Sequence, residues 1–108
     1  MPNLTFFIWS HQMPSQPLLD LLTAESDHLC RTVLQAQPGT VHILYVAAQA
    51  GQGHPIFADL RYRQTDSRTP EVMTRFMRAL DQSIHQITGQ TARIRCFGHG
   101  PTSLYARN

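Results

Sequence analysis

The chain of 108 residues is short enough to form one domain, which we expect to span residues 1–108. Hydrophobic residues make up 42% of it and charged residues only 15%, a balance that excludes an intrinsically disordered chain. The net charge of +2 does not indicate a nucleic-acid-binding protein. The apolar run at residues 6–9 is too short to cross a membrane or to form a signal-peptide core. We therefore expect a cytoplasmic protein with neither nucleic-acid nor membrane partners.

The cysteines and histidines indicate neither a disulfide framework nor a metal centre. Cys30 and Cys96 lie far apart in the sequence and form no CxxC pair, so we expect two reduced thiols in the core. The six histidines show neither HxxxH nor HExxH spacing. We therefore predict no metal site and no cofactor.

The first half of the chain predicts a strand, a helix and a second strand. Residues 4–9 are rich in aromatic and β-branched side chains, which are typical of a strand. Ser15 is a plausible helix N-cap, and apolar residues then recur at helical spacing, so we expect a helix that runs to Gln37 and ends at the Pro-Gly pair that follows. Residues 40–48 contain the continuous apolar run VHILYVAA, which predicts a buried strand.

The second half repeats this order. The alternating pattern of residues 55–63 predicts a strand. Thr69 is a strong N-cap, followed by a proline and an acidic residue, and the helix that it begins should end at Gly89. Residues 93–97 predict another strand, and residues 104–105 predict a short terminal strand.

A repeat of pattern relates the two halves, residues 2–50 and 55–108. An offset of 53 residues places Pro2 on Pro55 and Leu4 on Phe57. Beyond the prolines, the matched residues are similar in type but not identical. Two βαβ units predict an α/β (α+β) fold, a four-stranded sheet with both helices on one face. The other face would carry apolar side chains, which association of subunits would cover.

Positive charge is concentrated in the second half of the chain. Eight of the nine arginines follow residue 54, and the sequence contains no lysine. Arginine is suited to bidentate contacts with carboxylates or phosphates, which favours a small anionic ligand. A general compositional bias toward arginine explains the same counts equally well.

The order of elements and several short motifs resemble the tautomerase superfamily. That superfamily includes the 4-oxalocrotonate tautomerases, macrophage migration inhibitory factor and the 3-chloroacrylic acid dehalogenases. The resemblance spans nearly the whole chain and rests on the Met-Pro start, on PIFADL at residues 55–60, on SRT at 67–69 and on RIR at 93–95. The opening MPNLTF is also similar to a little-characterised, single-domain branch of the superfamily.

The resemblance implies a tautomerase that acts on a small carboxylated keto–enol compound, without a cofactor, as a homotrimer. Pro2 matches the catalytic proline, whose amine becomes a general acid or base once the initiator Met is removed. Arg68 matches an arginine that binds the substrate carboxylate, and Arg95 matches one that contacts substrate from a neighbouring subunit. Arg61 or Arg63 matches a second arginine of the two-repeat members.

Departures from the family pattern keep other functions open. Ser67 replaces the usual glycine before the motif arginine, and a retained Met1 would turn the amine of Pro2 into an amide. The scaffold would then serve as a non-catalytic binder of small anions or as a structural oligomer. RNA-binding RRM domains share the βαββαβ order, but residues 57–63 lack the aromatic pattern of their RNP1 strand.

Overall fold

The computed structural model describes all residues, 1–108, and forms one four-stranded sheet with two long helices. The elements in chain order are β1 (Asn3–Trp9), a 3₁₀ turn (Ser10–Gln12), α1 (Gln16–Thr32), β2 (His42–Ala48), β3 (Ile56–Arg63), α2 (Pro70–Thr88) and β4 (Ala92–His99). The strand order is β2-β1-β3-β4. Each βαβ unit pairs its own strands in parallel, and the two units meet through the antiparallel pair β1 and β3. The predicted α/β fold is confirmed.

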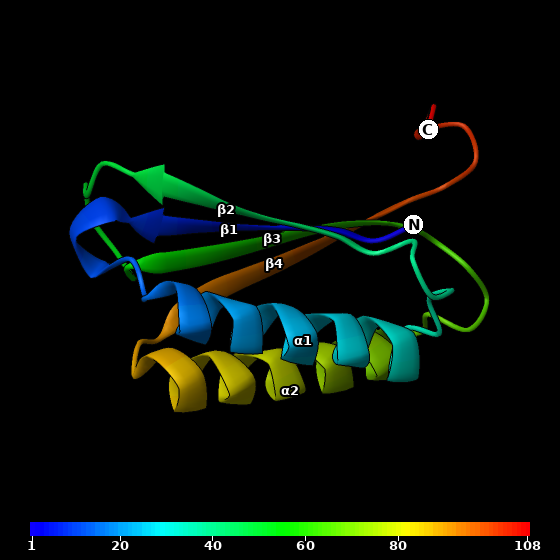
Figure 1. The fold of residues 1–108 in the computed structure, drawn as a ribbon. Coiled ribbons are helices and arrows are strands. Elements are labelled where there is room, and N and C mark those ends of the chain that lie inside the picture. The colour runs from blue at the N-terminus through cyan, green and yellow to red at the C-terminus, as the bar shows by residue number, and fades with distance from the viewer.

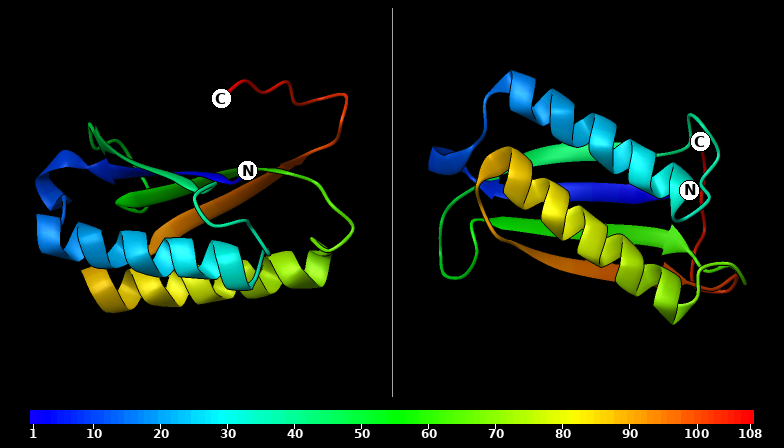
Figure 2. Two further views of the ribbon diagram at one scale, coloured as in Figure 1. Left: turned by 45° about the vertical axis from the view of Figure 1, so that its right-hand side comes forward. Right: turned by 90° about the horizontal axis from the view of Figure 1, so that it is seen from below.

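Both helices cover the same face of the sheet, and the other face has no helix over it (Figure 1). Alternate residues of the two central strands, among them Leu4, Phe6 and Leu60, are buried beneath the helices. The view from below shows α1 and α2 side by side across the sheet (Figure 2, right). No helix combines the length and the apolar character that crossing a membrane requires.

The second helix begins and ends where its sequence signals predict. The Thr69 side chain accepts a hydrogen bond of 3.3 Å from the backbone N–H of Val72, which satisfies one free donor of the first turn. Gly89 follows the last turn with φ of 71°, a left-handed conformation that glycine adopts without strain.

The first helix is shorter than predicted, because it ends at Thr32 rather than at Gln37. Gln35 adopts a left-handed φ of 57°, and the backbone N–H of Ala36 donates to the carbonyl of Cys30 over 3.0 Å. This pattern closes a helix C-terminus and is usually built around glycine. The Pro-Gly pair at residues 38–39 therefore lies in the connection that follows the helix and does not end it.

The offset of 53 residues is wrong for most of the repeat. The buried helix residues Leu19, Leu22, Ser26 and Cys30 correspond to Met73, Phe76, Leu80 and Ile84 at an offset of 54. The buried strand residues Leu4 and Phe6 likewise correspond to Ala58 and Leu60. A slip by one residue moves every strand side chain to the opposite face, so burial decides between the two offsets.

The apolar run of the first half forms β2, but this strand is not buried on both faces. Leu44 is 62% exposed and Val46 is 38% exposed on the face away from the helices, whereas Tyr45 stacks on Phe6 beneath them. A continuous apolar sequence therefore marks a strand with one face still uncovered. The terminal strand predicted at residues 104–105 is also wrong, because these residues form no strand.

The two cysteines are free thiols on the helix side of the sheet. Cys30 of α1 is buried, and Cys96 of β4 is half-buried. Burial, followed by the negative charge of Asp27, raises the pKa of Cys30 to about 12. Burial also raises the pKa of Cys96 to about 11. Both side chains are therefore neutral thiols at pH 7.

Candidate functional site

The site is built around the start of β1, where the chain is held firmly in the sheet. The Pro2 ring is fully buried, and the Pro2 carbonyl accepts a hydrogen bond of 3.0 Å from the backbone N–H of His42. Met1 precedes it and is 45% exposed. The amine of Met1 therefore lies at the surface, one residue outside a rigidly placed proline.

Arg68 lies beside this start in a buried position, only 7% exposed. Its Nε donates to the carbonyl of Leu34 over 3.0 Å, and its Nη1 donates to the carbonyl of Arg63 over 2.8 Å. The guanidinium lies 5.9 Å from the ring centre of Tyr62. Two of its three nitrogens thus bind main-chain carbonyls, and Nη2 has no partner in the chain.

This environment disfavours a positive charge on the N-terminal amine. Burial lowers the pKa of the Met1 α-amino group below its ordinary value of 8.0. The positive charges of Arg68 and then of Arg63 lower the pKa further. At the start of β1, the neutral form of an amine, which can accept a proton, is therefore favoured more than it is in water.

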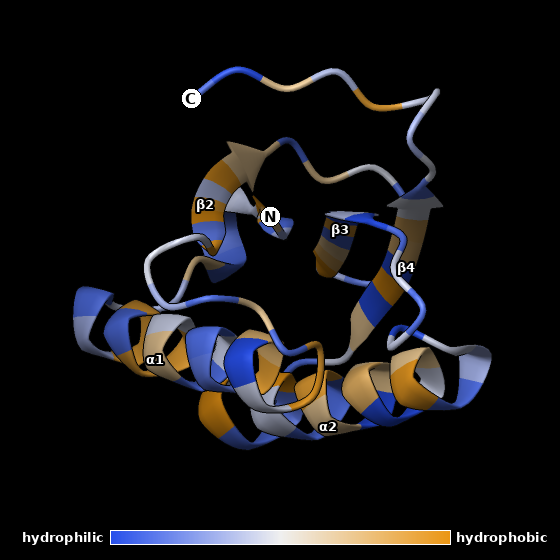
Figure 3. Ribbon diagram, turned by 90° about the vertical axis from the view of Figure 1, so that its right-hand side faces the viewer, coloured by the Kyte–Doolittle hydropathy of each residue, from blue (hydrophilic) through white to orange (hydrophobic).

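A cavity of about 430 Å³ opens beside the amine. One side of it is formed by Met1, Asn3, His42 and Arg63, and the other side by residues 104–108. Figure 3 shows these last residues crossing the sheet on the side opposite the helices, near the N-terminus. The volume lies within the range of ~300–1,000 Å³ that is typical of small-molecule sites.

The predicted site arginines do not all converge on this cavity. Arg63 lines it, and Arg68 lies close enough to act on the amine from its buried position. Arg61 instead donates to Asp59 over 3.0 Å and lies 4.2 Å from the ring centre of Phe97. Arg95 is exposed on β4, which β3 separates from β1, so a single chain does not bring it to Pro2.

The lining residues that escaped prediction include Asn3, His42 and Arg107. Asn3 and His42 are partners in the β1–β2 register, which sequence alone does not specify. Arg107 follows β4 by several residues, and its position depends on how that segment turns back. Only the clustering of arginine in the second half of the chain could have drawn attention to it.

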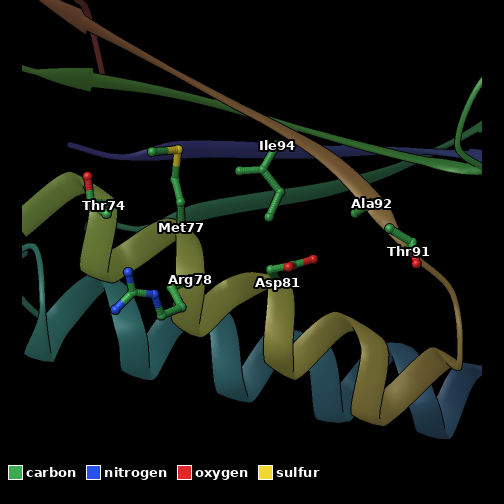
Figure 4. Close-up of a pocket in the computed structure, with 7 residues that line it drawn as sticks. All are labelled: Thr74, Met77, Arg78, Asp81, Thr91, Ala92 and Ile94. Atoms are coloured by element: carbon green, nitrogen blue, oxygen red, sulfur yellow. The ribbon is translucent and has the colours of Figure 1, made fainter.

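A second cavity of about 420 Å³ lies between α2 and the edge strand β4, away from the amine. Figure 4 shows Met77 and Ile94 on its inner side, with Arg78 and Asp81 reaching along the helix. Its charged lining residues are Arg78 and Asp81, and none of the predicted site residues lines it. The structure also holds no group of three His, Cys, Asp or Glu side chains that could bind a metal ion.

Comparison with known proteins identifies the fold. No protein-family model and no curated protein sequence matches the chain. Solved structures do match: macrophage migration inhibitory factor of Toxoplasma gondii superposes with a TM-score of 0.76 at 12% identity, covering 96% of this chain and 95% of that one. The chain has the tautomerase fold.

Two further structures of this fold bear other functional names. A fused 4-OT, described as a symmetric trimer, superposes with a TM-score of 0.74 at 15% identity, over 94% of this chain and 90% of that one. A malonate semialdehyde decarboxylase has a TM-score of 0.74 at 8% identity, over 98% and 91%. Proteins with different activities thus share the tautomerase fold, and the activity of this chain has to be argued from its own site.

Proposed function

We propose that the protein is a keto–enol tautomerase in which Pro2, freed by removal of Met1, is the general acid and base. The observation that carries the proposal is the N-terminal amine, whose pKa is lowered by burial and by Arg68 and Arg63, beside a cavity of about 430 Å³. Removal of Met1 places a secondary amine one residue further into the same environment. The same causes then act on the amine of Pro2 and favour its neutral, proton-accepting form.

The proposed reaction moves one proton within a small 2-keto acid. The lone pair of the Pro2 nitrogen takes a proton from the carbon next to the carbonyl, and the electrons of that C–H bond form the enolate. The protonated Pro2 nitrogen then gives its proton, directly or through a water molecule, to the enolate oxygen, which forms the enol and regenerates the neutral amine; the reverse order returns the keto acid. Because only protons move, the reaction requires neither a metal nor an organic cofactor.

The arginines have separate proposed roles. Arg63 lines the cavity with no ion-pair partner, so its guanidinium binds the substrate carboxylate. Arg68 disfavours the charged form of the amine, and its Nη2 has no hydrogen-bond partner in the chain. Arg61 is already paired with Asp59, so a carboxylate bound there would have to replace that partner.

We propose a homotrimer as the working assembly. The strands expose large apolar side chains away from the helices: Leu44 and Val46 of β2 and Phe97 of β4. Burial of these side chains between subunits favours association. In such a trimer Arg95 of one subunit approaches Pro2 of its neighbour, as the resemblance to the superfamily implies. The trimeric fused 4-OT of the same fold supports this arrangement.

The test starts from protein made without an N-terminal tag, whose intact mass reports whether Met1 is present. Turnover of phenylenolpyruvate to its keto form is then measured for the wild type, for Pro2→Ala and for Pro17→Ala. We expect Pro2→Ala to lower kcat/KM by about 10²-fold or more, the usual contribution of a general acid or base. Pro17 is exposed in the first turn of α1, which begins at the opposite end of the sheet from the N-terminus (Figure 1), so its variant should keep wild-type activity. Full activity of Pro2→Ala would refute the mechanism.

A second candidate function is the binding of small anions without chemistry. With Met1 in place the Pro2 nitrogen is an amide and cannot accept a proton, while Arg63 still faces the cavity. Such a protein binds 2-keto acids equally well with and without Met1 and turns none of them over. Retention of Met1 in the native host would favour this function.

A further inference from the structure

A cavity of about 310 Å³ lies at the end of the sheet opposite both termini. The connection between β2 and β3, residues 49–55, forms one side of it, and Figure 1 shows this connection at the far end of the sheet from the N- and C-termini. The backbone N–H of Trp9 donates to the carbonyl of Pro55 over 2.9 Å, which ties the connection to the end of β1. No residue lines both this cavity and the one beside the N-terminal amine.

Three aromatic side chains of the central strands line the cavity: Phe7, Trp9 and Phe57, which we call the aromatic floor. Phe7 and Trp9 alternate with buried residues of β1, so both side chains lie on the helix-free face. Phe57 of β3 is the register partner of Phe7, and the two ring centres lie 5.9 Å apart with 20° between the ring planes. All three side chains are only half-buried, so part of their surface is open to a ligand.

A guanidinium borders the aromatic floor. Arg93 of β4 is the register partner of Phe57, and its guanidinium carbon lies 5.7 Å from the centre of the Phe57 ring. Arg93 belongs to neither ion pair of the chain, and no Asp or Glu lines the cavity. The terminal carboxylate of Asn108 belongs to the residue that lines the other cavity. Asp59, on the same face of β3, already accepts a hydrogen bond from Arg61 over 3.0 Å.

The floor and the guanidinium together favour a flat ring that carries a negative charge. An aromatic ring can pack on the exposed faces and edges of the floor, which favour aromatic partners. A carboxylate on that ring can accept charge-assisted hydrogen bonds from Arg93. Gln49 and Gln52 of the connection add amide groups that both donate and accept. An aliphatic anion lacks the first interaction, and a neutral aromatic compound lacks the second.

We propose that this cavity is a binding site for a small aromatic carboxylate, with its ring on the aromatic floor and its carboxylate on Arg93. The volume lies at the lower end of the range of ~300–1,000 Å³ for small-molecule sites, which fits a ligand of this size. The site is separate from the N-terminal amine, so it does not depend on the tautomerase activity proposed above.

Trp9 provides the signal for a test, because it is the only tryptophan of the chain and lines the cavity. Its fluorescence is measured during titration with benzoate, with cyclohexanecarboxylate, which lacks the aromatic ring, and with benzamide, which lacks the charge. Benzoate should change the fluorescence saturably. Benzamide should bind about tenfold more weakly, because it loses a charge-assisted contact, and cyclohexanecarboxylate about threefold or more. Equal binding of the three, or a change that does not saturate, would overturn the proposal.

Two variants assign the contacts within the site. Arg93→Gln should weaken benzoate binding by about tenfold and leave benzamide binding within about twofold. Phe57→Leu should remove the preference for benzoate over cyclohexanecarboxylate. The matched control is Arg75→Gln, which removes an exposed arginine of α2 and should bind benzoate as the wild type does. Undiminished benzoate binding in Arg93→Gln would show that Arg93 is not the partner of the carboxylate and would refute the proposal.

The same titration separates this site from the N-terminal cavity. Arg63→Gln changes that cavity and should leave the benzoate signal unaltered, whether or not the protein turns over enol acids. A signal lost in Arg63→Gln would place benzoate beside the N-terminal amine and would overturn the proposal. Failure of the tautomerase and failure of this site are therefore distinguishable.

The proposed trimer covers the helix-free face, so the cavity has to stay open in the assembled protein. The wild type is therefore titrated at a concentration at which sedimentation shows its working assembly. Saturable benzoate binding under these conditions is the expected result. Binding by the Leu44→Asp variant but not by the assembled wild type would mean that a neighbouring subunit fills the cavity, and the proposal would then be wrong.

Discussion

The Nη1 of Arg68 donates to the main-chain carbonyl of Arg63 over 2.8 Å, so the residue predicted to bind substrate also fixes the end of β3. Its Nε holds the carbonyl of Leu34, which lies after α1, over 3.0 Å. One guanidinium therefore ties the end of the first helix to the strand that carries Arg63 toward the cavity. The fork geometry of arginine permits this, and a lysine ammonium could not span both acceptors in the same way.

Replacement of Arg68 by lysine should therefore destabilise the fold as well as alter the site. The loss of one or both charge-assisted hydrogen bonds to buried carbonyls should lower the free energy of unfolding by about 2–3 kcal/mol. Urea unfolding of Arg68→Lys, with Arg75→Lys as an exposed control, measures this change. A variant as stable as the wild type would show that the two carbonyls find other donors.

Gly98 is required where β4 passes the ring of Tyr62. A Cβ at this position would lie 2.8 Å from the Tyr62 hydroxyl and 2.6 Å from Oε1 of Gln64. Gln64 can rotate away, but Tyr62 is buried, so Gly98→Ala should cost about 1–3 kcal/mol of stability. Gly100→Ala meets nothing within 4 Å and should be neutral in the same thermal melt. Equal stability of the two variants would contradict the close approach.

The buried thiols should make the protein less stable in alkali. The pKa of Cys30 rises from 9.0 to about 12 on folding, so the folded state keeps a proton that the unfolded state loses. The free energy of unfolding is therefore unaffected by this thiol below pH 9 and falls as pH rises from 9 toward 12, by up to ~1.4 kcal/mol per pH unit. Cys96 acts in the same direction up to its pKa of about 11.

Urea unfolding between pH 8 and pH 11 tests this effect in the wild type and in Cys30→Ala. The free energy of unfolding should fall less steeply with pH in the variant. It should still fall, because burial also raises the pKa values of Tyr45 and Tyr62. Identical slopes for the two proteins would mean that Cys30 ionises freely in the folded state.

The helix-free face should control the oligomeric state. Leu44 is 62% exposed on that face, and Leu21 is 55% exposed on α1. A charge at Leu44 would be buried in the proposed trimer at a large cost, so sedimentation should show Leu44→Asp as a monomer. Leu21→Asp carries the same charge outside the proposed interface and should sediment as a trimer. A wild-type monomer, or a trimer of Leu44→Asp, would contradict the assembly.

Local signals in the sequence predicted most of the fold. Thr69 and Gly89 bracket α2 because capping depends on the residue and its immediate neighbours. The end of α1 was missed because Gln35, without a glycine, takes a left-handed conformation that the surrounding packing permits. The repeat offset was wrong by one residue because apolar residues on both faces of the strands hide which face is buried.

The candidate site was only partly predictable. Pro2 and Arg68 follow from short motifs and lie at one place in the fold. The main-chain bonds of Arg68 do not follow from the sequence, because Leu34 becomes its neighbour only when the helix ends early. Arg107 was missed for a similar reason, since a turn after β4 rather than a strand carries it to the cavity.

The proposed mechanism depends on a free amine at Pro2. One protein preparation that retains Met1 should be divided, and one half treated with methionine aminopeptidase until its intact mass shows loss of Met1. The mechanism predicts that phenylenolpyruvate turnover rises by about 10²-fold or more with the loss of Met1, because an amide becomes a base. Equal turnover in the two halves would contradict the role of Pro2.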